Sequence, residues 1–271
     1  MSKKDKQGPR IIAVVNQKGG VGKTTTSINL ATALAATGRK TLMIDLDPQG
    51  NASTGLGIGQ QDRGESIYDV LLGSRSLDDV VVDTEIPGLN IAPANVNLAG
   101  AELQLINHDR RSYQLRDALK DLNRTHLAHP YDCILIDCPP SLNLLTLNAL
   151  AAANSVLVPM QCEFFALEGL SLLLRTIERV QGGLNRTLKM EGVVLTMYDG
   201  RNNLARQVQE DVRDYLGDDV FRTVIPRNIR LSEAPGYGMP ALIFDHQCQG
   251  SQAYIALASE LLQRNNGLQA A

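Results

Sequence analysis

The feature that most constrains this chain is a glycine-rich loop that joins an apolar run to a helical pattern. Residues 11–15 are apolar and mostly β-branched, which is typical of a buried parallel strand. Residues 24–36 carry apolar side chains at helical spacing, and Gly38 follows as a stop signal. Residues 18–25 connect the two and hold three glycines. A strand, a glycine-rich turn and a helix start in this order predict a phosphate-binding loop.

The loop departs from the usual phosphate-loop pattern at one position and gains a lysine. The pattern G-x-x-x-x-G-K-[ST] fits Gly22, Lys23 and Thr24, but Gln17 stands where the first glycine is usual. Lys18, five residues before Lys23, adds a second cation to a loop whose backbone N–H groups already point at phosphate. The sequence therefore predicts a deviant phosphate loop that contains two lysines.

The residues expected to contact the phosphates of ATP are consecutive. They are Lys18, Gly19, Gly20, Val21, Gly22, Lys23, Thr24 and Thr25. Lys23 is expected to bridge the β- and γ-phosphates, and the Thr24 hydroxyl to ligate Mg²⁺. The glycines let the backbone approach the phosphates without a Cβ. ATP and Mg²⁺ are thus the expected cofactors.

Short apolar runs and amphipathic patterns alternate along the rest of the chain. Further strands are expected at residues 41–44, 89–92, 133–136, 155–158, 192–196 and 220–225. Further helices are expected at residues 67–72, 98–106, 113–122, 144–152, 167–180, 204–216 and 252–263, and the pattern is weakest over 60–87. This alternation predicts an α/β fold with a doubly wound, mostly parallel sheet and helices on both faces. We expect a disordered leader at 1–9, a single P-loop ATPase domain at 10–264 and a flexible tail at 265–271.

Acidic residues follow two of the expected strands, at the sheet edge where doubly wound folds bind ligands. Asp137 ends the apolar run 133–136, the Walker B arrangement in which an acid holds Mg²⁺, usually through water. Asp45 and Asp47 follow the strand at 41–44 and share one face, because they are two residues apart. One of these two is expected to reach the γ-phosphate region and to orient the attacking water.

Composition excludes several classes of protein. No apolar run approaches the roughly 20 residues that a membrane-spanning helix needs. The four cysteines show no C-x-x-C spacing, so reduced thiols in a cytosolic protein are expected. The net charge of −3 argues against a surface coated in basic residues, but it allows a local basic patch.

Three segments together resemble one known family. They are 16–25 (NQKGGVGKTT), 45–51 (DLDPQGN) and 136–142 (IDCPPSL), and the similarity continues through 158–170, 194–199 and 225–235. In these segments the chain resembles the ParA (Soj) chromosome-partitioning ATPases, which carry a deviant Walker A loop. The resemblance extends from about residue 10 to about residue 262. Because the loop begins within the first twenty residues, it is closest to the small, chromosomal type of ParA.

The resemblance implies roles for individual residues. Lys18 would cross to the ATP of a partner subunit, so that a homodimer encloses two ATP molecules, and Lys23 would serve the phosphates of its own subunit. Asp47 would be the acid that positions water, which makes Lys18, Lys23 and Asp47 the expected catalytic residues. Pro226 and Asn228 would contact adenine.

The resemblance also implies a function. An ATP-bound dimer would bind double-stranded DNA without sequence specificity, and a ParB-type protein that binds the centromere would stimulate ATP hydrolysis and release it. Such a protein would partition chromosome or plasmid DNA in the cytoplasm, associated with the nucleoid and not with a membrane. After Lys189 every basic residue except His246 is arginine, and Arg201, Arg222 and Arg230 are the expected DNA contacts.

Three other classes share the loop. A MinD-like, membrane-associated positioning ATPase is the main alternative, but residues 261–271 are too polar and too weakly basic for a membrane-binding helix. A nitrogenase iron protein or an iron–sulfur carrier would need cysteines around a cluster, and only Cys138 has a comparable place. A metabolic ligase on the same fold is the third alternative.

Overall fold

One eight-stranded sheet forms the centre of the computed structural model, which describes residues 8–125 and 131–268. Its strands are β1 (Arg10–Val14), β2 (Thr41–Asp45), β3 (Val82–Asp83), β4 (Leu89–Ala92), β5 (Cys133–Asp137), β6 (Ser155–Gln161), β7 (Lys189–Tyr198) and β8 (Val220–Pro226). Their order is β3-β4-β2-β5-β1-β6-β7-β8, and among these pairs only β3 and β4 run antiparallel. The predicted mostly parallel, doubly wound sheet is confirmed.

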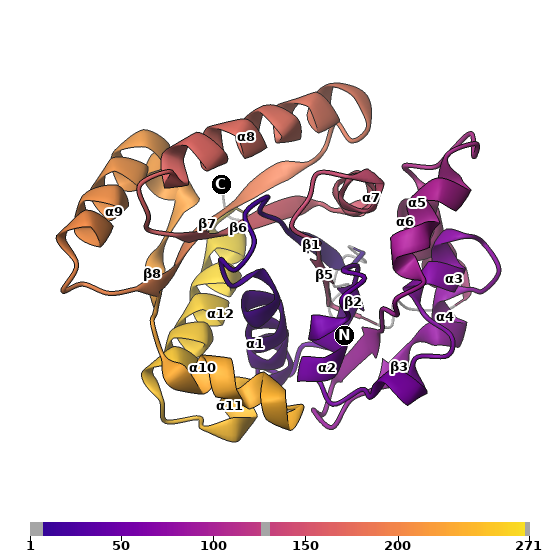
Figure 1. Ribbon diagram of the computed structural model, residues 1–271, viewed down its shortest axis with the longest axis horizontal. Helices are drawn as coiled ribbons and strands as arrows, with labels where there is room; N and C mark the ends of the chain where they lie inside the picture. Colours follow the sequence, from indigo (N-terminus) through magenta and orange to yellow (C-terminus); the bar gives the residue numbers. More distant parts are fainter. Residues whose placement is uncertain (1–7, 126–130, 269–271) are drawn as a thin grey trace, which may run out of the picture.

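Helices cover both faces of this sheet, as expected for parallel strands joined by crossovers. One face carries α1 (Lys23–Ala36), α2 (Asn51–Gly55), α10 (Ile229–Glu233), α11 (Ala241–Phe244) and α12 (Gln249–Leu268). The other carries α3 (Ile67–Leu71), α4 (Leu77–Val80), α5 (Leu98–Leu105), α6 (Gln114–Thr125), α7 (Leu144–Ala152), α8 (Ala166–Gly183) and α9 (Asn203–Leu216). Figure 1 shows α7, α8 and α9 on the opposite side of the sheet from α1 and α12.

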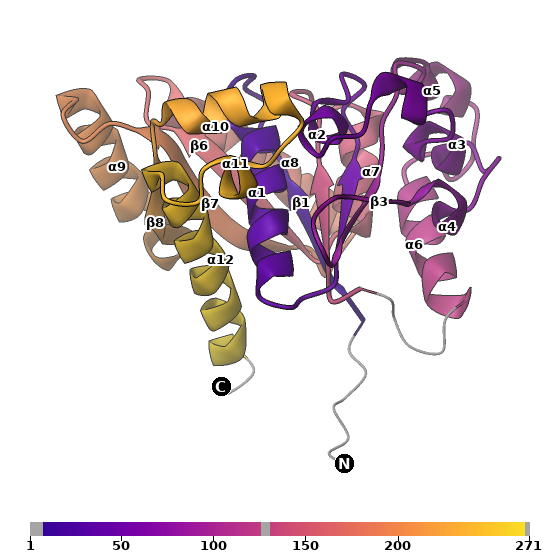
Figure 2. The same cartoon turned by 90° about the horizontal axis from the view of Figure 1, so that it is seen from below.

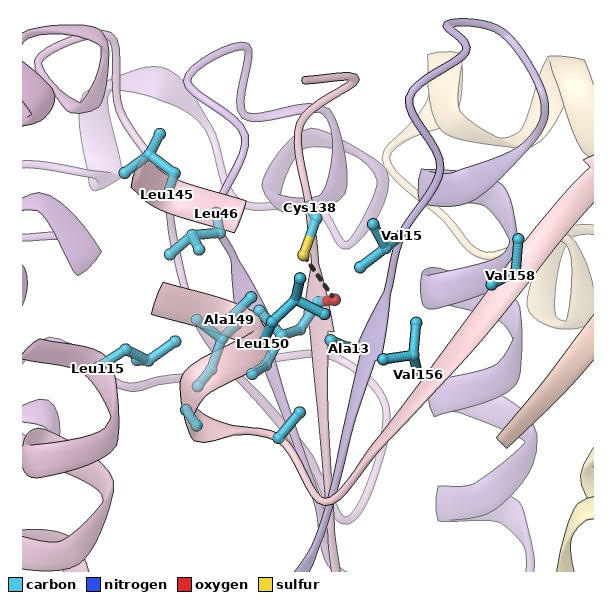
Figure 3. Close-up of a cluster of buried hydrophobic side chains, with 14 of the residues drawn as sticks. Ala13, Val15, Leu46, Leu115, Cys138, Leu145, Ala149, Leu150, Val156 and Val158 are labelled. Atoms are coloured by element: carbon cyan, nitrogen blue, oxygen red, sulfur yellow. Dashed lines mark hydrogen bonds between the residues drawn. The ribbon is translucent and has the colours of Figure 1, made fainter. Parts of the chain in front are cut away.

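The central strands are buried on both faces, which explains why they are continuous apolar runs. All five residues of β5 are buried, and so are all five of β2. Figure 3 shows the core between the sheet and α7, where Ala13 and Val15 meet Leu150. Cys138 lies in the same cluster, 1% exposed, and its thiol donates to the Ile136 carbonyl at 3.8 Å. The thiol is therefore part of the packed core.

The strand order places a ligand crevice beside β1. From β1 the chain crosses to β2 on one side, and from β5 it crosses over β1 to β6 on the other. Such a change of direction opens a crevice at the carboxyl ends of the strands. Figure 2, in which α1 and α12 lie in front of the sheet, shows α2 and α10 at that same edge. The loop between β1 and α1 lies at this crevice.

The structure differs from the sequence-based expectation mainly between β2 and β4. The stretch with the weakest pattern contains α3, α4 and the short edge strand β3, of which only α3 was expected. Further on, β6 continues to Gln161 through Pro159, which lies beyond Leu157, the last residue paired with β1, so its missing N–H breaks no bond to that strand. Helix α12 runs to Leu268, past the predicted domain boundary at residue 264. Residues 1–7 of the predicted leader at 1–9, and the last three residues of the chain, lie outside the described residues.

Among the helices of the described residues, none is both long and apolar enough to cross a membrane.

We predict that Gly192→Ala destabilises the fold. Gly192 follows a bulge in β7 and has φ +146°, and an added Cβ would lie 2.7 Å from the Phe221 ring and 2.8 Å from the Asp219 carbonyl. The free energy of unfolding, measured with urea, should fall by about 1–3 kcal/mol because of overpacking and backbone strain.

Gly182→Ala is the matched control, because nothing lies within 4 Å of its added Cβ and its φ is not positive. This control should leave stability unchanged or raise it slightly. Equal stability in the two variants would contradict the account of the bulge.

Candidate nucleotide-binding site

The loop between β1 and α1 has the backbone that glycines permit. Gly20 and Gly22 have φ +74° and +84°, and Gly22 is the left-handed residue that precedes α1. The loop is supported from β7, because the Thr196 hydroxyl donates to the Val21 carbonyl at 2.8 Å. A Cβ on Gly22 would meet the side chains of Thr196 and Met197 at 3.8–3.9 Å. The loop is therefore supported by the neighbouring strand β7.

Lys23 is positioned across the loop that contains it. It is 6% exposed, and its Nζ donates to the Lys18 carbonyl at 2.9 Å. Burial lowers the pKa of Lys23, while the nearby Asp137 and Asp47 act in the opposite direction. A buried cation with carboxylates beside it is suited to bind an anion such as a phosphate.

Two buried carboxylates lie side by side at the carboxyl ends of β2 and β5. Asp45 and Asp137 are register partners, and both are fully buried. Burial raises the pKa of Asp137 to about 7, and the charge of Asp45 adds to this shift. Burial also raises the pKa of Asp45 to about 6. The pair thus concentrates negative charge at one point of the sheet edge.

Hydroxyl groups from α1 satisfy Asp137. Its Oδ2 accepts from the Thr24 hydroxyl and its Oδ1 from the Ser27 hydroxyl, both at 2.8 Å. The sequence singled out Thr24 and Asp137 and missed Ser27. The signal for Ser27 was its spacing, because residues three apart on a helix share one face and so present both hydroxyls to the same acid.

Asp45 is engaged by the backbone and by α2. Its Oδ2 accepts from the Ser53 amide at 2.8 Å and the Ser53 hydroxyl at 2.7 Å, and its Oδ1 accepts from the Asp47 amide at 3.2 Å. Sequence reasoning left open which of Asp45 and Asp47 serves the γ-phosphate. These hydrogen bonds use both oxygens of Asp45 to hold the segment after β2 in place. Asp47 is therefore the better candidate for the γ-phosphate region.

The donor set at Asp137 suits Mg²⁺. A carboxylate and a hydroxyl are the oxygen ligands that this ion prefers, and the neighbouring Asp45 supplies further negative charge that a cation would offset. Thr24 and Asp137 are the residues that would hold the ion. A bound Mg²⁺ would neutralise charge on phosphate oxygens.

Asp47 lies in the turn that follows β2. It is 7% exposed, its Oδ1 accepts from the Gln49 amide at 3.0 Å, and its carbonyl accepts from the Gly50 amide at 2.9 Å. Its charge opposes the lowering of the Lys23 pKa by burial. The assignment of Asp47 as the acid that positions water stays a prediction.

Lys18 has surroundings unlike those of Lys23. Its ammonium forms an ion pair with Glu163, in the segment between β6 and α8, and these two side chains are 51% and 42% exposed. The Lys18 amide donates to the Asn16 side chain at 3.0 Å. Lys18 therefore points toward solvent, whereas Lys23 is buried.

The two predicted adenine contacts lie at the end of β8. Pro226 is the last residue of this strand and is half-buried. Asn228 caps α10, because its side-chain oxygen accepts from the Arg230 amide at 2.9 Å. Their contact with adenine stays a prediction.

The three arginines predicted to contact DNA lie on different elements of the structure. Arg201 follows β7 and pairs with Asp199 at 2.7 Å, and Arg230 in α10 pairs with Glu233 at 2.9 Å. Arg222 lies four residues before the end of β8, about 13 Å at the usual rise per residue. Within the described part of the chain, the guanidinium of Arg222 forms no ion pair.

The chain is similar to known proteins over most of its length. Residues 9–190 match a family model described as AAA domain. The chain is 58% identical over 261 residues to the chromosome partitioning protein ParA of Caulobacter vibrioides, covering 96% of this chain and 97% of that protein. It is 50% identical over 252 residues to the sporulation initiation inhibitor protein Soj of Bacillus subtilis, covering 93% and 98%. A solved structure, cobyrinic acid a,c-diamide synthase from Mycobacterium smegmatis with bound ATP analog and magnesium, matches with a TM-score of 0.82 and 39% identity over 95% of this chain and 96% of that chain.

We predict that Ser27→Ala destabilises the protein by about 1–3 kcal/mol, because the buried Asp137 carboxylate loses one of its two hydroxyl donors. Urea unfolding of the protein without nucleotide measures the effect. Thr32→Val is the control, since among the described residues the Thr32 hydroxyl bonds only the carbonyl of Ile28, one turn earlier in the same helix. A loss at Thr32 as large as that at Ser27 would contradict the special role of the carboxylate.

Proposed function

The chain belongs to the ParA/Soj family of chromosome-partitioning ATPases, and on this basis we propose that it is an ATP-dependent dimerisation switch for DNA partitioning. In the ATP-bound state two subunits would enclose two nucleotides and bind double-stranded DNA without reading its sequence. A ParB-type partner would stimulate hydrolysis and release the DNA. The observation that carries this proposal is the placement of the two lysines, one buried in the loop and one exposed beside it.

ATP with Mg²⁺ is the proposed ligand of the crevice. The glycine loop, the buried Lys23 and the Thr24–Asp137 pair supply the parts that a triphosphate and a magnesium ion require. A solved relative at 39% identity holds an ATP analogue and magnesium. Residues 18–25 would contact the phosphates, and Pro226 and Asn228 would contact adenine.

Hydrolysis would depend mainly on Asp47 and the two lysines. Asp47 is a nearly buried carboxylate in the turn after β2, and its charge acts on Lys23, which fits an acid that orients a water molecule toward the γ-phosphate. Lys23 would stabilise the charge that develops on the phosphates of its own subunit. Neither group brings a covalent step, so the rate would depend on position and charge.

Lys18 would supply the link between nucleotide and dimer. An ion pair between half-exposed side chains contributes only about 0–1 kcal/mol, so its bond to Glu163 can be exchanged for a stronger bond to phosphate. The next two residues after Glu163 are Phe164 and Phe165, which are 75% and 69% exposed. Exposed aromatic side chains beside the loop support the view that a second subunit covers this face.

DNA binding would rest on arginines near the β7–β8 edge of the sheet. Contacts to phosphate need only positive charge, and a dimer doubles the number of contacts that one subunit offers. The ion pairs of Arg201 and Arg230 offset part of their charge, which favours Arg222 as the strongest single contributor.

The proposed place of action is the cytoplasm, in association with the nucleoid. The sequence left a MinD-like positioning ATPase as the main alternative. The relative at 58% identity is named a chromosome partitioning protein, which favours the DNA-directed function over a membrane-directed one.

Lys18→Ala should bind ATP as a monomer and fail to form the ATP dimer, because the cross-subunit cation is lost. Size-exclusion chromatography with light scattering, in Mg²⁺ and a slowly hydrolysed ATP analogue, measures this. Lys120→Ala is the control, since Lys120 is also exposed and also pairs with a carboxylate. Its Nζ lies 3.8 Å from Asp117 Oδ1. A dimer of normal size and stability in Lys18→Ala would sink the cross-subunit role.

Arg222→Glu should weaken binding to linear double-stranded DNA in the presence of ATP, with unchanged affinity for ATP. The charge reversal adds repulsion from the DNA phosphates. The milder variant Arg222→Ala should reduce the slope of log affinity against log salt concentration by about one, the value for one lost phosphate contact. Fluorescence anisotropy with labelled DNA at several salt concentrations measures both effects.

Arg201→Glu is the comparison, and it should cost less affinity because Asp199 already offsets much of its charge. Unchanged DNA affinity in Arg222→Glu would place the DNA-binding patch elsewhere.

A further inference from the structure

Arg63 is a buried arginine outside the phosphate loop, and it binds the segment that follows Asp47. It comes directly after a short 3₁₀ turn at Gln60–Asp62, between α2 and α3, and is 4% exposed. A buried guanidinium costs several kcal/mol of desolvation unless its donors are satisfied. Within the described residues Arg63 forms no ion pair, so its N–H donors must bond to uncharged acceptors.

The guanidinium bonds three acceptors in the segment 50–58. Its Nη1 donates to the Gly50 carbonyl at 3.1 Å, and its Nη2 donates to the Thr54 hydroxyl at 2.7 Å. Its Nε and Nη2 both donate to the Ile58 carbonyl, at 3.1 and 2.5 Å. The planar fork of an arginine suits such a set of fixed acceptors, and a lysine ammonium would not reproduce it.

The Gly50 carbonyl ties this arrangement to Asp47. It accepts from the Thr54 amide at 3.0 Å and the Thr54 hydroxyl at 3.1 Å in addition to Arg63. The Gly50 amide, at the other end of the same residue, donates to the Asp47 carbonyl at 2.9 Å. Bonds on both sides of Gly50 therefore fix the turn whose first residue is Asp47.

Close packing makes the contact between Arg63 and this turn specific. Gly50 has φ +62°, and a Cβ added there would lie 2.3 Å from Arg63 Nη1 and 3.1 Å from the Ala94 carbonyl. The guanidinium occupies the space that a side chain at position 50 would take. The turn and the arginine are thus a matched pair, and movement of one requires movement of the other.

Arg63 also connects the turn to the neighbouring strand. Its own carbonyl accepts from the Asn95 side chain at 3.1 Å, three residues after the end of β4. The Ala94 amide donates to Ser53, whose hydroxyl in turn donates to Asp45. The segment after β2 is therefore anchored to the end of β4 through two separate routes.

From this geometry we propose that Arg63 is a positioning residue for Asp47. It fixes the Asp47–Gly50 turn through the Gly50 carbonyl, so that the carboxylate lies where it can orient water for attack on the γ-phosphate. The inference rests on the proposed hydrolysis of ATP and on the role of Asp47 in it. It assigns Arg63 no contact with the nucleotide.

Arg63→Met tests the proposal, because methionine keeps an unbranched apolar stem and removes all five N–H donors. Single-turnover hydrolysis with Mg-ATP and linear double-stranded DNA should slow by about 10- to 100-fold, the loss that a small displacement of a catalytic group causes. The dissociation constant for a fluorescent ATP analogue should stay within about two-fold of wild type, because the phosphate loop is intact. Arg63→Lys should not restore the rate, since one ammonium cannot bond the three acceptors.

The decisive measurement is the same substitution in an Asp47→Ala background. If Arg63 acts through Asp47, Arg63→Met should lower the residual rate of Asp47→Ala no further. A further loss as large as that in the wild-type background would overturn the proposal. A wild-type rate in Asp47→Ala alone would refute the role of Asp47, and with it the positioning role of Arg63. The proposed dimerisation switch does not depend on that result, because it is tested separately by Lys18→Ala.

Arg264→Met is the control for loss of stability alone. Arg264 also donates to two backbone carbonyls, those of Asp218 and Val220 at 2.9 and 2.8 Å, but it lies in α12, which packs against the edge strand β8. It should lower the melting temperature with little change in the rate. An Arg63→Met protein that behaves like this control, with a rate within about two-fold of wild type, would overturn the proposal.

Thr54→Val keeps the test available if Arg63→Met does not fold. Valine has nearly the shape of threonine but removes the hydroxyl that links Arg63 Nη2 to the Gly50 carbonyl. The rate should fall by a smaller factor, about three- to ten-fold, again with no further loss in the Asp47→Ala background. An unchanged rate in a folded Thr54→Val protein would count against the positioning role.

Discussion

The structure depends on the burial of two neighbouring carboxylates at the carboxyl ends of β2 and β5. Asp45 and Asp137 face each other in register and are fully buried, and unpaired buried charge of this kind costs several kcal/mol. The surroundings offset the cost with hydroxyl and amide donors from α1 and α2, and with the nearby Lys23. A hydrogen bond to a charged group contributes about 1.5–3 kcal/mol, so these donors are as important to the fold as to the site. The same residual negative charge is what makes the crevice suitable for a cation and the phosphates that accompany it.

This constraint also explains why the two lysines differ. Lys23 must remain close to the acids, so it is buried and held by the Lys18 carbonyl. Lys18 is not needed to balance the buried charge, because its ammonium forms a half-exposed ion pair with Glu163 instead. A cation held only by a weak pair can be redirected at low cost. In the proposed function the fold keeps one lysine for its own nucleotide and leaves the other for a second subunit.

Most of the sheet and the centre of the site could be predicted from the sequence, because their signals are local. The run 133–136 is apolar since β5 is buried on both faces, and its end marks Asp137. The glycines and Lys23 follow from the chemistry of phosphate binding. By contrast, β3 is two residues long and pairs antiparallel at the edge, so it carries no apolar run that a pattern could detect. Glu163 was missed because it meets Lys18 across 145 residues of sequence, a contact that only the assembled sheet creates.

The segment from Gly50 to Arg63, which ends inside the stretch with the weakest sequence pattern, holds two of the side chains that organise the site. This segment holds only the short helix α2 and one 3₁₀ turn, and side chains that bond to backbone groups hold much of it together. Apolar periodicity cannot reveal such a segment, because its order comes from polar contacts. Yet Ser53 satisfies Asp45 from this segment, and Arg63 fixes the turn after Asp47 from its end. A turn held by hydrogen bonds can adopt a second arrangement more readily than a packed core, which suits the place where the presence of a γ-phosphate would be sensed.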